Sequence, residues 1–216
     1  MNLDLNQLVK WRREFHRFPE IGWSEFWTTS RIADYLEDLD CFEIFLGKQI
    51  INPDFVRGRK QAVVDKGLAN AKAYGANEKW LEKMEGYTGC VALFDSGKPG
   101  KTIALRFDID CVNVTETRSS EHIPNKEGFA SINDGFMHAC GHDSHITIGL
   151  GVALWIAQNK DKLTGKVKIV FQPAEEGVRG AAAIAQSGII DDADYFASSH
   201  ISFYANTGTV IANPRN

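Results

Sequence analysis

The second half of the chain alternates between segments with the pattern of strands and segments with the pattern of helices. Three β-rich runs, at 101–110, 166–172 and 194–199, are separated by stretches whose apolar residues recur at helical spacing. Such alternation is typical of α/β proteins, in which helices cover the faces of a largely parallel sheet. The 216 residues, 44% of them hydrophobic, are enough for one sizeable core. The sequence therefore predicts a layered α/β fold.

The first half of the chain is predicted to be mainly helical. An amphipathic helix ends at Pro19, and a second helix begins with Ser24 as its N-cap. The charged, alanine-rich stretch at about 53–85 also has a helical pattern, which is interrupted near Gly75. We expect this stretch to be a peripheral helical insertion.

Local signals predict how several other elements begin or connect. The runs at 88–94 and 101–110 are joined by a turn containing Gly and Pro, which indicates a β-hairpin. Asp143 or Ser144 is a candidate N-cap for the helix that follows it. A last short strand is predicted at 209–212.

Composition excludes several classes of protein. The net charge is −4, and the basic residues are scattered among acidic ones, so no basic surface for nucleic acid is expected. The longest apolar run, 148–157, is too short to span a membrane, and the N-terminus lacks the pattern of a signal peptide. The four cysteines contain no C-x-x-C pair and are expected to be free thiols. We therefore expect a cytoplasmic protein without a nucleic-acid or membrane partner.

The segment FMHACGHDSH contains one thiol and three imidazoles. Cys140 and His142 are separated by a single glycine, so both side chains can reach one ion, and a thiolate with an imidazole favours zinc. A histidine-rich turn without a metal is the alternative for this segment alone. His138 and His145 are interpreted as supporting or packing residues, and His16 on the first helix as a solvated or packing one.

Side chains with metal-binding or acid–base chemistry lie at several predicted strand ends and loops. In open α/β sheets the ligand crevice lies beyond the carboxyl ends of the strands. The groups at such ends are Asp108 with Asp110, the loop of Cys140 and His142, Glu175 with Glu176, and His200. Their expected convergence favours a metal site over isolated loop residues.

The adjacent glutamates suggest a division of labour. The side chains of Glu175 and Glu176 diverge, so one can bind metal while the other transfers protons; a solvated acidic turn is the alternative. Asp110 suits a supporting role, in which it orients a ligating group. For Asp108, a cap at the strand end and a functional role are equally plausible.

Four motifs together resemble a known family. ALRFDID, MHACGHDSH, FQPAEEG and SSHIS occur in the order and spacing of the zinc-type amidohydrolases and metallopeptidases that include hippurate hydrolase, indole-acetyl-amino-acid hydrolases and carboxypeptidase-like aminoacylases. The resemblance covers essentially the whole chain. It implies an α/β fold with the three layers of a zinc-exopeptidase catalytic domain and a mostly parallel mixed sheet.

The resemblance also implies a centre with two divalent metal ions, zinc or manganese. The implied ligands are Cys140, which bridges the two ions, His142 and His200 at one ion, and Glu176 at the other. Glu175 is then the general base, and Asp110 is the supporting aspartate of the catalytic machinery.

The function implied is metal-dependent hydrolysis of the amide bond of p-aminobenzoyl-glutamate or of a related small N-acyl amino acid. Members of the family continue into a lid and dimerisation domain and the second half of the catalytic domain. We therefore expect residues 1–216 to form the N-terminal part of the catalytic domain, incomplete at its C-terminus and without the lid domain. The alternative is an inactive fragment, or one half that needs a complementary C-terminal chain.

Overall fold

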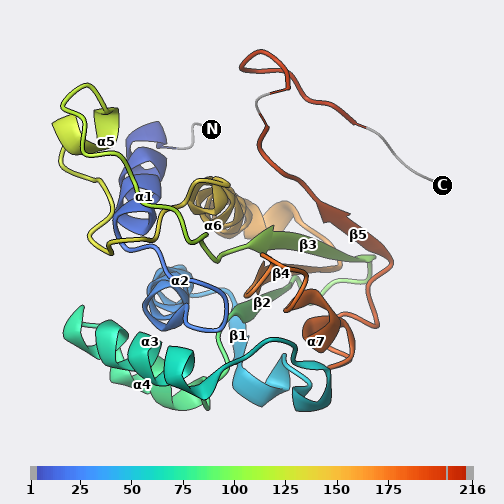
Figure 1. Ribbon diagram of the computed structural model, residues 1–216. Coiled ribbons are helices and arrows are strands. Elements are labelled where there is room, and N and C mark those ends of the chain that lie inside the picture. The colour runs from blue at the N-terminus through green and yellow to red at the C-terminus, as the bar shows by residue number, and fades with distance from the viewer. Residues whose placement is uncertain (1–3, 203, 213–216) are drawn as a thin grey trace.

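A computed structural model describes residues 4–202 and 204–212, and its centre is a mixed five-stranded sheet (Figure 1). The strand order is β1-β2-β4-β3-β5. The strands are β1 (Glu43–Leu46), β2 (Cys90–Asp95), β3 (Thr102–Asp108), β4 (Lys166–Gln172) and β5 (Tyr195–Ser198). β4, β3 and β5 are parallel to one another, whereas β2 is antiparallel to both β1 and β4. The predicted α/β class is therefore confirmed, and the parallel pairings are those of the β4–β3–β5 part of the sheet.

Helices lie on both faces of this sheet (Figure 1). The α-helices are α1 (Leu5–Arg17), α2 (Phe26–Asp38), α3 (Gln61–Ala73), α4 (Glu78–Lys83), α5 (Ile123–Lys126), α6 (His142–Asn159) and α7 (Ala181–Ala185). Short 3₁₀ helices are η1 (Gly47–Gln49), η2 (Pro53–Phe55) and η3 (Lys160–Lys162). Within the described part of the chain, no helix combines the length and the apolar character that crossing a membrane requires.

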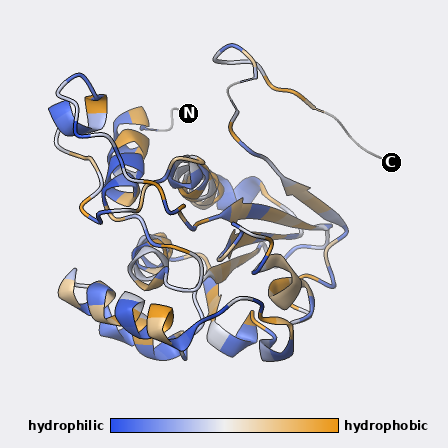
Figure 2. Ribbon diagram, in the orientation of Figure 1, coloured by the Kyte–Doolittle hydropathy of each residue, from blue (hydrophilic) through white to orange (hydrophobic). Residues whose placement is uncertain are grey.

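The alternating side chains of β4 join two separate cores. Ile169 and Phe171 pack into the larger core, which α1, α2 and α6 share, whereas Val170 packs into a smaller core with Ala183 and Ile184 of α7. Successive residues of a strand point to opposite faces, so this split places one core on each side of the sheet. Figure 2 shows mostly hydrophobic residues along these central strands. The three-layer arrangement is therefore confirmed.

The predicted hairpin between β2 and β3 is wrong, because β4 lies between them and pairs with both. The connecting turn instead bonds to the start of β4: Ser96 N–H donates to the Gly165 carbonyl at 3.1 Å, and Gly165 N–H donates to the Lys98 carbonyl at 3.1 Å. A turn signal fixes the reversal of the chain but not which strands become neighbours. The strongly buried β4 needs a partner at each edge and takes the position between the two.

Both predicted helix caps are also wrong. Ser24 Oγ donates to the Ile21 carbonyl, and Glu25 holds the N-cap position of α2. Further along, α6 begins directly at His142 after Gly141, whose φ of +83° is the left-handed conformation that glycine tolerates. Asp143 therefore lies inside the first turn of α6, and the metal-binding motif forms the start of the helix rather than a loop before it.

The remaining local predictions have mixed outcomes. The stretch at 53–85 is helical, with α3 and α4 separated at Gly75 as expected. Residues 209–212 are described and form no strand. Val210 is 89% exposed and has no neighbouring strand to pair with, so its apolar side chain alone does not produce one.

Candidate metal centre

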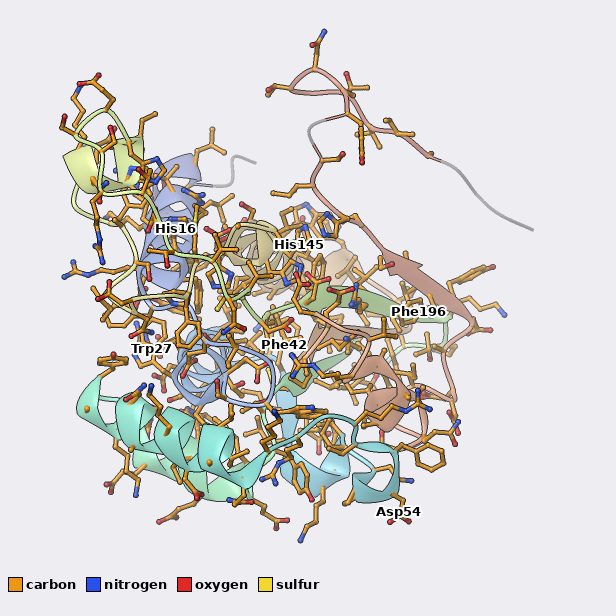
Figure 3. All side chains as sticks on the ribbon, in the orientation of Figure 1. His16, Trp27, Phe42, Asp54, His145 and Phe196 are labelled. Carbon is orange, nitrogen blue, oxygen red and sulfur yellow. The ribbon has the colours of Figure 1, made fainter. Side chains whose placement is uncertain are left out.

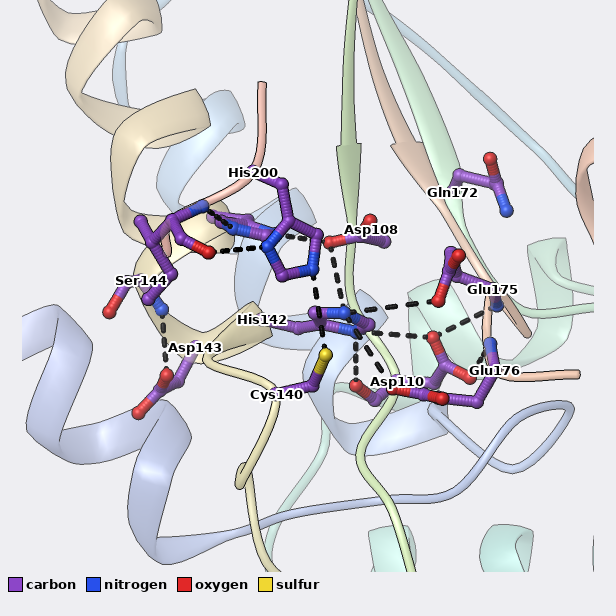
Figure 4. Close-up of polar contacts among 12 residues, drawn as sticks. Asp108, Asp110, Cys140, His142, Asp143, Ser144, Gln172, Glu175, Glu176 and His200 are labelled. Carbon is purple, nitrogen blue, oxygen red and sulfur yellow. Dashed lines mark hydrogen bonds and ion pairs between the residues drawn. The ribbon is translucent and has the colours of Figure 1, made fainter. Parts of the chain in front are cut away.

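The parallel strands end on one edge of the sheet, and the predicted site residues gather there (Figure 4). Each comes from a different connection: Asp108 and Asp110 from the end of β3, Cys140 and His142 from the start of α6, Glu175 and Glu176 from the turn after β4, and His200 from the segment after β5. All six residues predicted to form the site, together with Asp108, are thus brought together. The left-handed Gly141 lets Cys140 and His142 approach the edge from one tight turn.

His142 lies at the centre and is fully buried. Its Nδ1 donates to the Asp110 backbone carbonyl at 2.7 Å, so Nε2 is left to carry the lone pair. Nε2 has no hydrogen-bond partner among the described residues, yet it lies 3.6 Å from Asp108 Oδ1 and 3.8 Å from Glu176 Oε1. Burial lowers the pKa of His142, but the bond to Asp110 and the charge of Asp108 outweigh it, so the pKa is raised.

Cys140 lies between two groups of potential ligands. Its Sγ is 3.5 Å from His200 Nε2, and His200 Nδ1 donates to the Ile201 carbonyl at 2.6 Å, so that Nε2 faces the sulfur as an acceptor. On the other side the thiol interacts with the Glu176 carboxylate. Burial, with the negative charge of Glu176, raises the pKa of the Cys140 thiol to about 11. A nearby cation would reverse this effect, because it favours the thiolate.

Asp110 holds the turn that carries both glutamates. Its Oδ1 accepts the backbone N–H of Glu175 at 2.9 Å, and its Oδ2 accepts the N–H of Glu176 at 3.0 Å (Figure 4). The two carboxylate side chains are thereby directed towards His142 rather than consumed in local bonds. Burial and the neighbouring Asp108 charge raise the pKa of Glu175, which is the direction a general base needs.

His145 and Asp108 form a pair behind these residues. His145 Nε2 accepts the Ile201 N–H at 2.9 Å, so its Nδ1 carries the proton and donates to Asp108. Asp108 also forms an ion pair with Arg106 at 2.8 Å. This chain of contacts fixes the backbone next to His200, so His145 has a supporting position rather than a free one. His138 is likewise buried, and burial lowers its pKa to about 4.

The donor set fits divalent cations. Three sets of ligand atoms each lie within 4.8 Å of one another: those of Cys140, His142 and His200, those of His142, Glu175 and Glu176, and those of Asp108, His142 and His145. His142 Nε2 and Glu176 Oε1 are buried without hydrogen-bond partners in the described chain. Buried carboxylates that converge in this way require a compensating positive charge. Thiolate, imidazole and carboxylate are ligands that zinc accepts in one site.

A second buried network lies behind α6, and the sequence did not indicate it. His16 is only 2% exposed; its Nδ1 is 2.7 Å from Asp143 Oδ2 and its Nε2 is 3.0 Å from Glu116 Oε1. Arg12 adds an ion pair with Asp143 at 3.0 Å. His16 is thus a buried residue of an ionic network that braces the first turn of α6. The interacting positions are more than 90 residues apart in the chain, so no local spacing could have revealed them.

Replacing His16 with glutamine is expected to cost roughly 3 kcal/mol of unfolding free energy near pH 5.5 and less near pH 8.5. Burial opposes a charged His16, but bonds to Asp143 and Glu116 raise its pKa above 6.5, so its contribution is complete below that pH and falls as pH rises through the folded value. The pKa of Glu116 is lowered from 4.5 because the bond to His16 outweighs burial, so its contribution falls as pH drops below that value. Urea unfolding of both proteins at several pH values tests this; a difference independent of pH would contradict it.

The fold and the site together define an α/β protein with a metal-binding edge. Residues 104–213 match the family model described as Peptidase family M20/M25/M40, and the chain belongs to this family. The resemblance inferred from the four sequence motifs is therefore confirmed.

Individual relatives agree with this assignment. The chain is 99% identical over 216 residues to a p-aminobenzoyl-glutamate hydrolase homolog of Haemophilus influenzae, and the match covers 100% of this chain and 51% of that protein. It is 43% identical over 217 residues to the indole-3-acetyl-aspartic acid hydrolase of Enterobacter agglomerans, covering 98% of this chain and 49% of that protein. The chain thus spans about half the length of the curated relatives it matches.

Solved structures give the same picture. The aminobenzoyl-glutamate utilization protein of Klebsiella pneumoniae has a TM-score of 0.75 at 35% identity, with 94% of this chain and 44% of that chain covered. The YXEP protein of Bacillus subtilis, described as a dinuclear metal binding peptidase of the M20 family, has a TM-score of 0.67 at 28% identity, covering 91% and 43%.

Proposed function

We propose that this chain carries the metal centre of an amidohydrolase that cleaves the amide bond of p-aminobenzoyl-glutamate or of a related N-acyl amino acid. The observation that carries the proposal is the convergence of a thiol, two imidazoles and two glutamates around the buried His142 Nε2. The names of the relatives from Haemophilus influenzae and Enterobacter agglomerans support a substrate in which an aromatic acyl group is joined to an acidic amino acid. Hydrolysis of the glutamate conjugate would belong to folate breakdown, and the free cysteines are consistent with the cytoplasm.

Two divalent ions, zinc or manganese, are the cofactors in this proposal. Cys140 would bridge them, His142 and His200 would complete the first site, and Glu176 would bind the second. The position of Cys140 between His200 and Glu176 supports the bridging role. When bound, the ions supply an activated water and polarise the scissile carbonyl.

Glu175 is the proton carrier in this scheme. Its carboxylate accepts a proton from the attacking water while the water oxygen bonds to the amide carbon. The same proton then passes to the amide nitrogen as the carbon–nitrogen bond breaks, which leaves a carboxylic acid and a free amine. Asp110 keeps this carboxylate in place through the backbone of the turn, so its role is to position the base.

A complementary chain is proposed as the partner, because the edge of the sheet at β5 is uncovered. Tyr195 is 60% exposed and Phe196 is 55% exposed, and they project from opposite faces of the sheet because Tyr195 pairs with Ile103 and Phe196 with Ala104. Parallel strands are normally covered on both faces. Figure 3 places Phe196 at the outer side of the molecule on β5.

The occupant we propose is a polypeptide equivalent to the part of the relatives that this chain does not match. Residues 1–216 would then be the N-terminal part of the catalytic domain, with 53–85 as an insertion. The alternative, a non-catalytic fragment that binds metal, requires no such partner.

The test is a hydrolysis assay with p-aminobenzoyl-glutamate on metal-loaded chain, alone and mixed with the remaining half of the Haemophilus influenzae relative. We expect turnover only in the mixture. Phe196→Glu should weaken the pairing at least tenfold, since it would bury an unpaired charge, about 1.4 kcal/mol or more. Val9→Glu, at an exposed apolar residue of α1, is the matched control and should pair normally. Full activity of the chain alone would remove the need for a partner, and an inactive mixture would favour the non-catalytic alternative.

A further inference from the structure

Glu25 occupies the N-cap position of α2 but does not cap it. Its carboxyl group, which is fully buried, instead reaches a residue 149 positions away: Oε1 accepts the Ala174 N–H at 2.7 Å. The other oxygen, Oε2, bonds to Thr88 Oγ1 at 2.6 Å. The helix cap is supplied by Glu20, whose carboxylate accepts the N–H groups of Trp27 and Thr28 at 3.1 and 2.8 Å.

Ala174 begins the turn that carries the two glutamates, and its backbone is strained. Its φ is +51°, a conformation that costs a non-glycine residue roughly 1–2 kcal/mol. Neighbouring backbone crowds it as well, since a Cβ on Gly22 would lie 2.8 Å from Ala174 Cα. Such a conformation persists only where the surroundings determine it strongly.

Two buried carboxyl groups supply that determination. Glu25 binds the N–H of Ala174, and Asp110 binds the next two N–H groups, those of Glu175 and Glu176. Three consecutive amides are therefore held from one side. Burial, with the nearby Asp110 charge, raises the pKa of Glu25 to about 8, so it is protonated at neutral pH and a glutamine could make both of its hydrogen bonds.

We propose that Glu25 is a positioning residue of the metal centre: by holding Ala174 N–H against Thr88, it sets the turn from which Glu175 and Glu176 reach the cations. The inference rests on the proposed function of those two glutamates. It adds the N-terminal end of α2 to the parts of the chain that shape the site.

Glu20 provides an unusually close control. It lies on the same segment, is almost fully buried, and burial raises its pKa to about 8, as for Glu25. Its bonds stay within the start of α2 and do not reach the turn. Loss of either carboxyl group should destabilise the fold, but only loss of Glu25 should disturb the glutamates.

The experiment compares Glu25→Ala and Glu25→Gln with Glu20→Ala and Glu20→Gln in the 216-residue chain. One readout is zinc affinity, measured by competition with a chromophoric chelator; the other is amide hydrogen exchange at residues 174–176 in the metal-free chain. For Glu25→Ala we expect zinc binding weaker by about 10–100-fold, the usual cost of losing a partner that orients a ligand. Exchange at these amides should be faster. Glu25→Gln should restore both readouts, and both Glu20 variants should leave them unchanged.

Wild-type zinc affinity and exchange in Glu25→Ala would overturn the inference, as would equal losses in Glu20→Ala. If Glu25→Ala does not fold, Glu25→Asp, which keeps the carboxyl group but shortens its reach, is judged by the same two readouts. If the wild-type chain binds no zinc, the proposed metal centre fails. The exchange comparison then decides alone whether Glu25 holds the turn.

Discussion

Replacing Glu175 with glutamine is expected to lower kcat for p-aminobenzoyl-glutamate by about 10²–10⁴-fold, the range that general acid–base catalysis contributes. Glutamine has the same size but cannot accept the proton of the attacking water. The turn should stay in place, because Asp110 binds the backbone N–H of Glu175 and not its side chain. Bound metal should therefore be unchanged, as elemental analysis beside steady-state kinetics on the active preparation would show.

Glu176→Gln is the matched control, since the two side chains are adjacent and similarly exposed, at 34% for Glu175 and 28% for Glu176. It should lose metal and, as a consequence, activity. The opposite pattern would contradict the proposal: metal lost in Glu175→Gln, with turnover alone lost in Glu176→Gln, would mean that the two glutamates exchange roles. Equal metal loss in both would make both of them ligands.

The fold was largely predictable because its elements have strong local signals. β4 matches the predicted strand 166–172 throughout, and its buried residues alternate between two cores as a central strand requires. The order of the strands was not predictable. The turn before β3 indicates a reversal of the chain, and only the burial of β4 on both sides explains why it separates β2 from β3.

The membership of the site followed from a positional rule, and its internal order did not. Side chains at the ends of parallel strands must meet at one edge, and on this basis Cys140, Glu176 and His200 could be grouped although they are distant in sequence. Their roles remain predictions. The contacts that orient them come from elsewhere: Glu25 reaches the glutamate turn across 149 positions, and no period or motif marks such a contact. Only packing of α2 against the sheet creates it.

Cys140→Ala is expected to have the largest effect on metal binding. The thiol is the group that lies between the His200 side and the Glu176 side of the centre, so its removal takes a ligand from both proposed ions at once. We expect the affinity for zinc to fall by more than about 100-fold, beyond the 10–100-fold that follows from losing an outer hydrogen-bond partner. Two ions per wild-type chain should become fewer than one in the variant at equal free zinc.

The measurement is zinc and manganese per purified chain after dialysis against a fixed free concentration. Cys41→Ala is the matched control, since Cys41 is also a partly buried free thiol but packs against the large core away from the strand ends, and it should keep both ions. Cys140→Ser should retain part of the affinity, because an oxygen at the same position can still bind a cation weakly. Metal content that is unchanged in Cys140→Ala would refute the bridging assignment. The centre would then have to be built from His142, Glu175 and Glu176, whose ligand atoms already lie within 4.8 Å of one another.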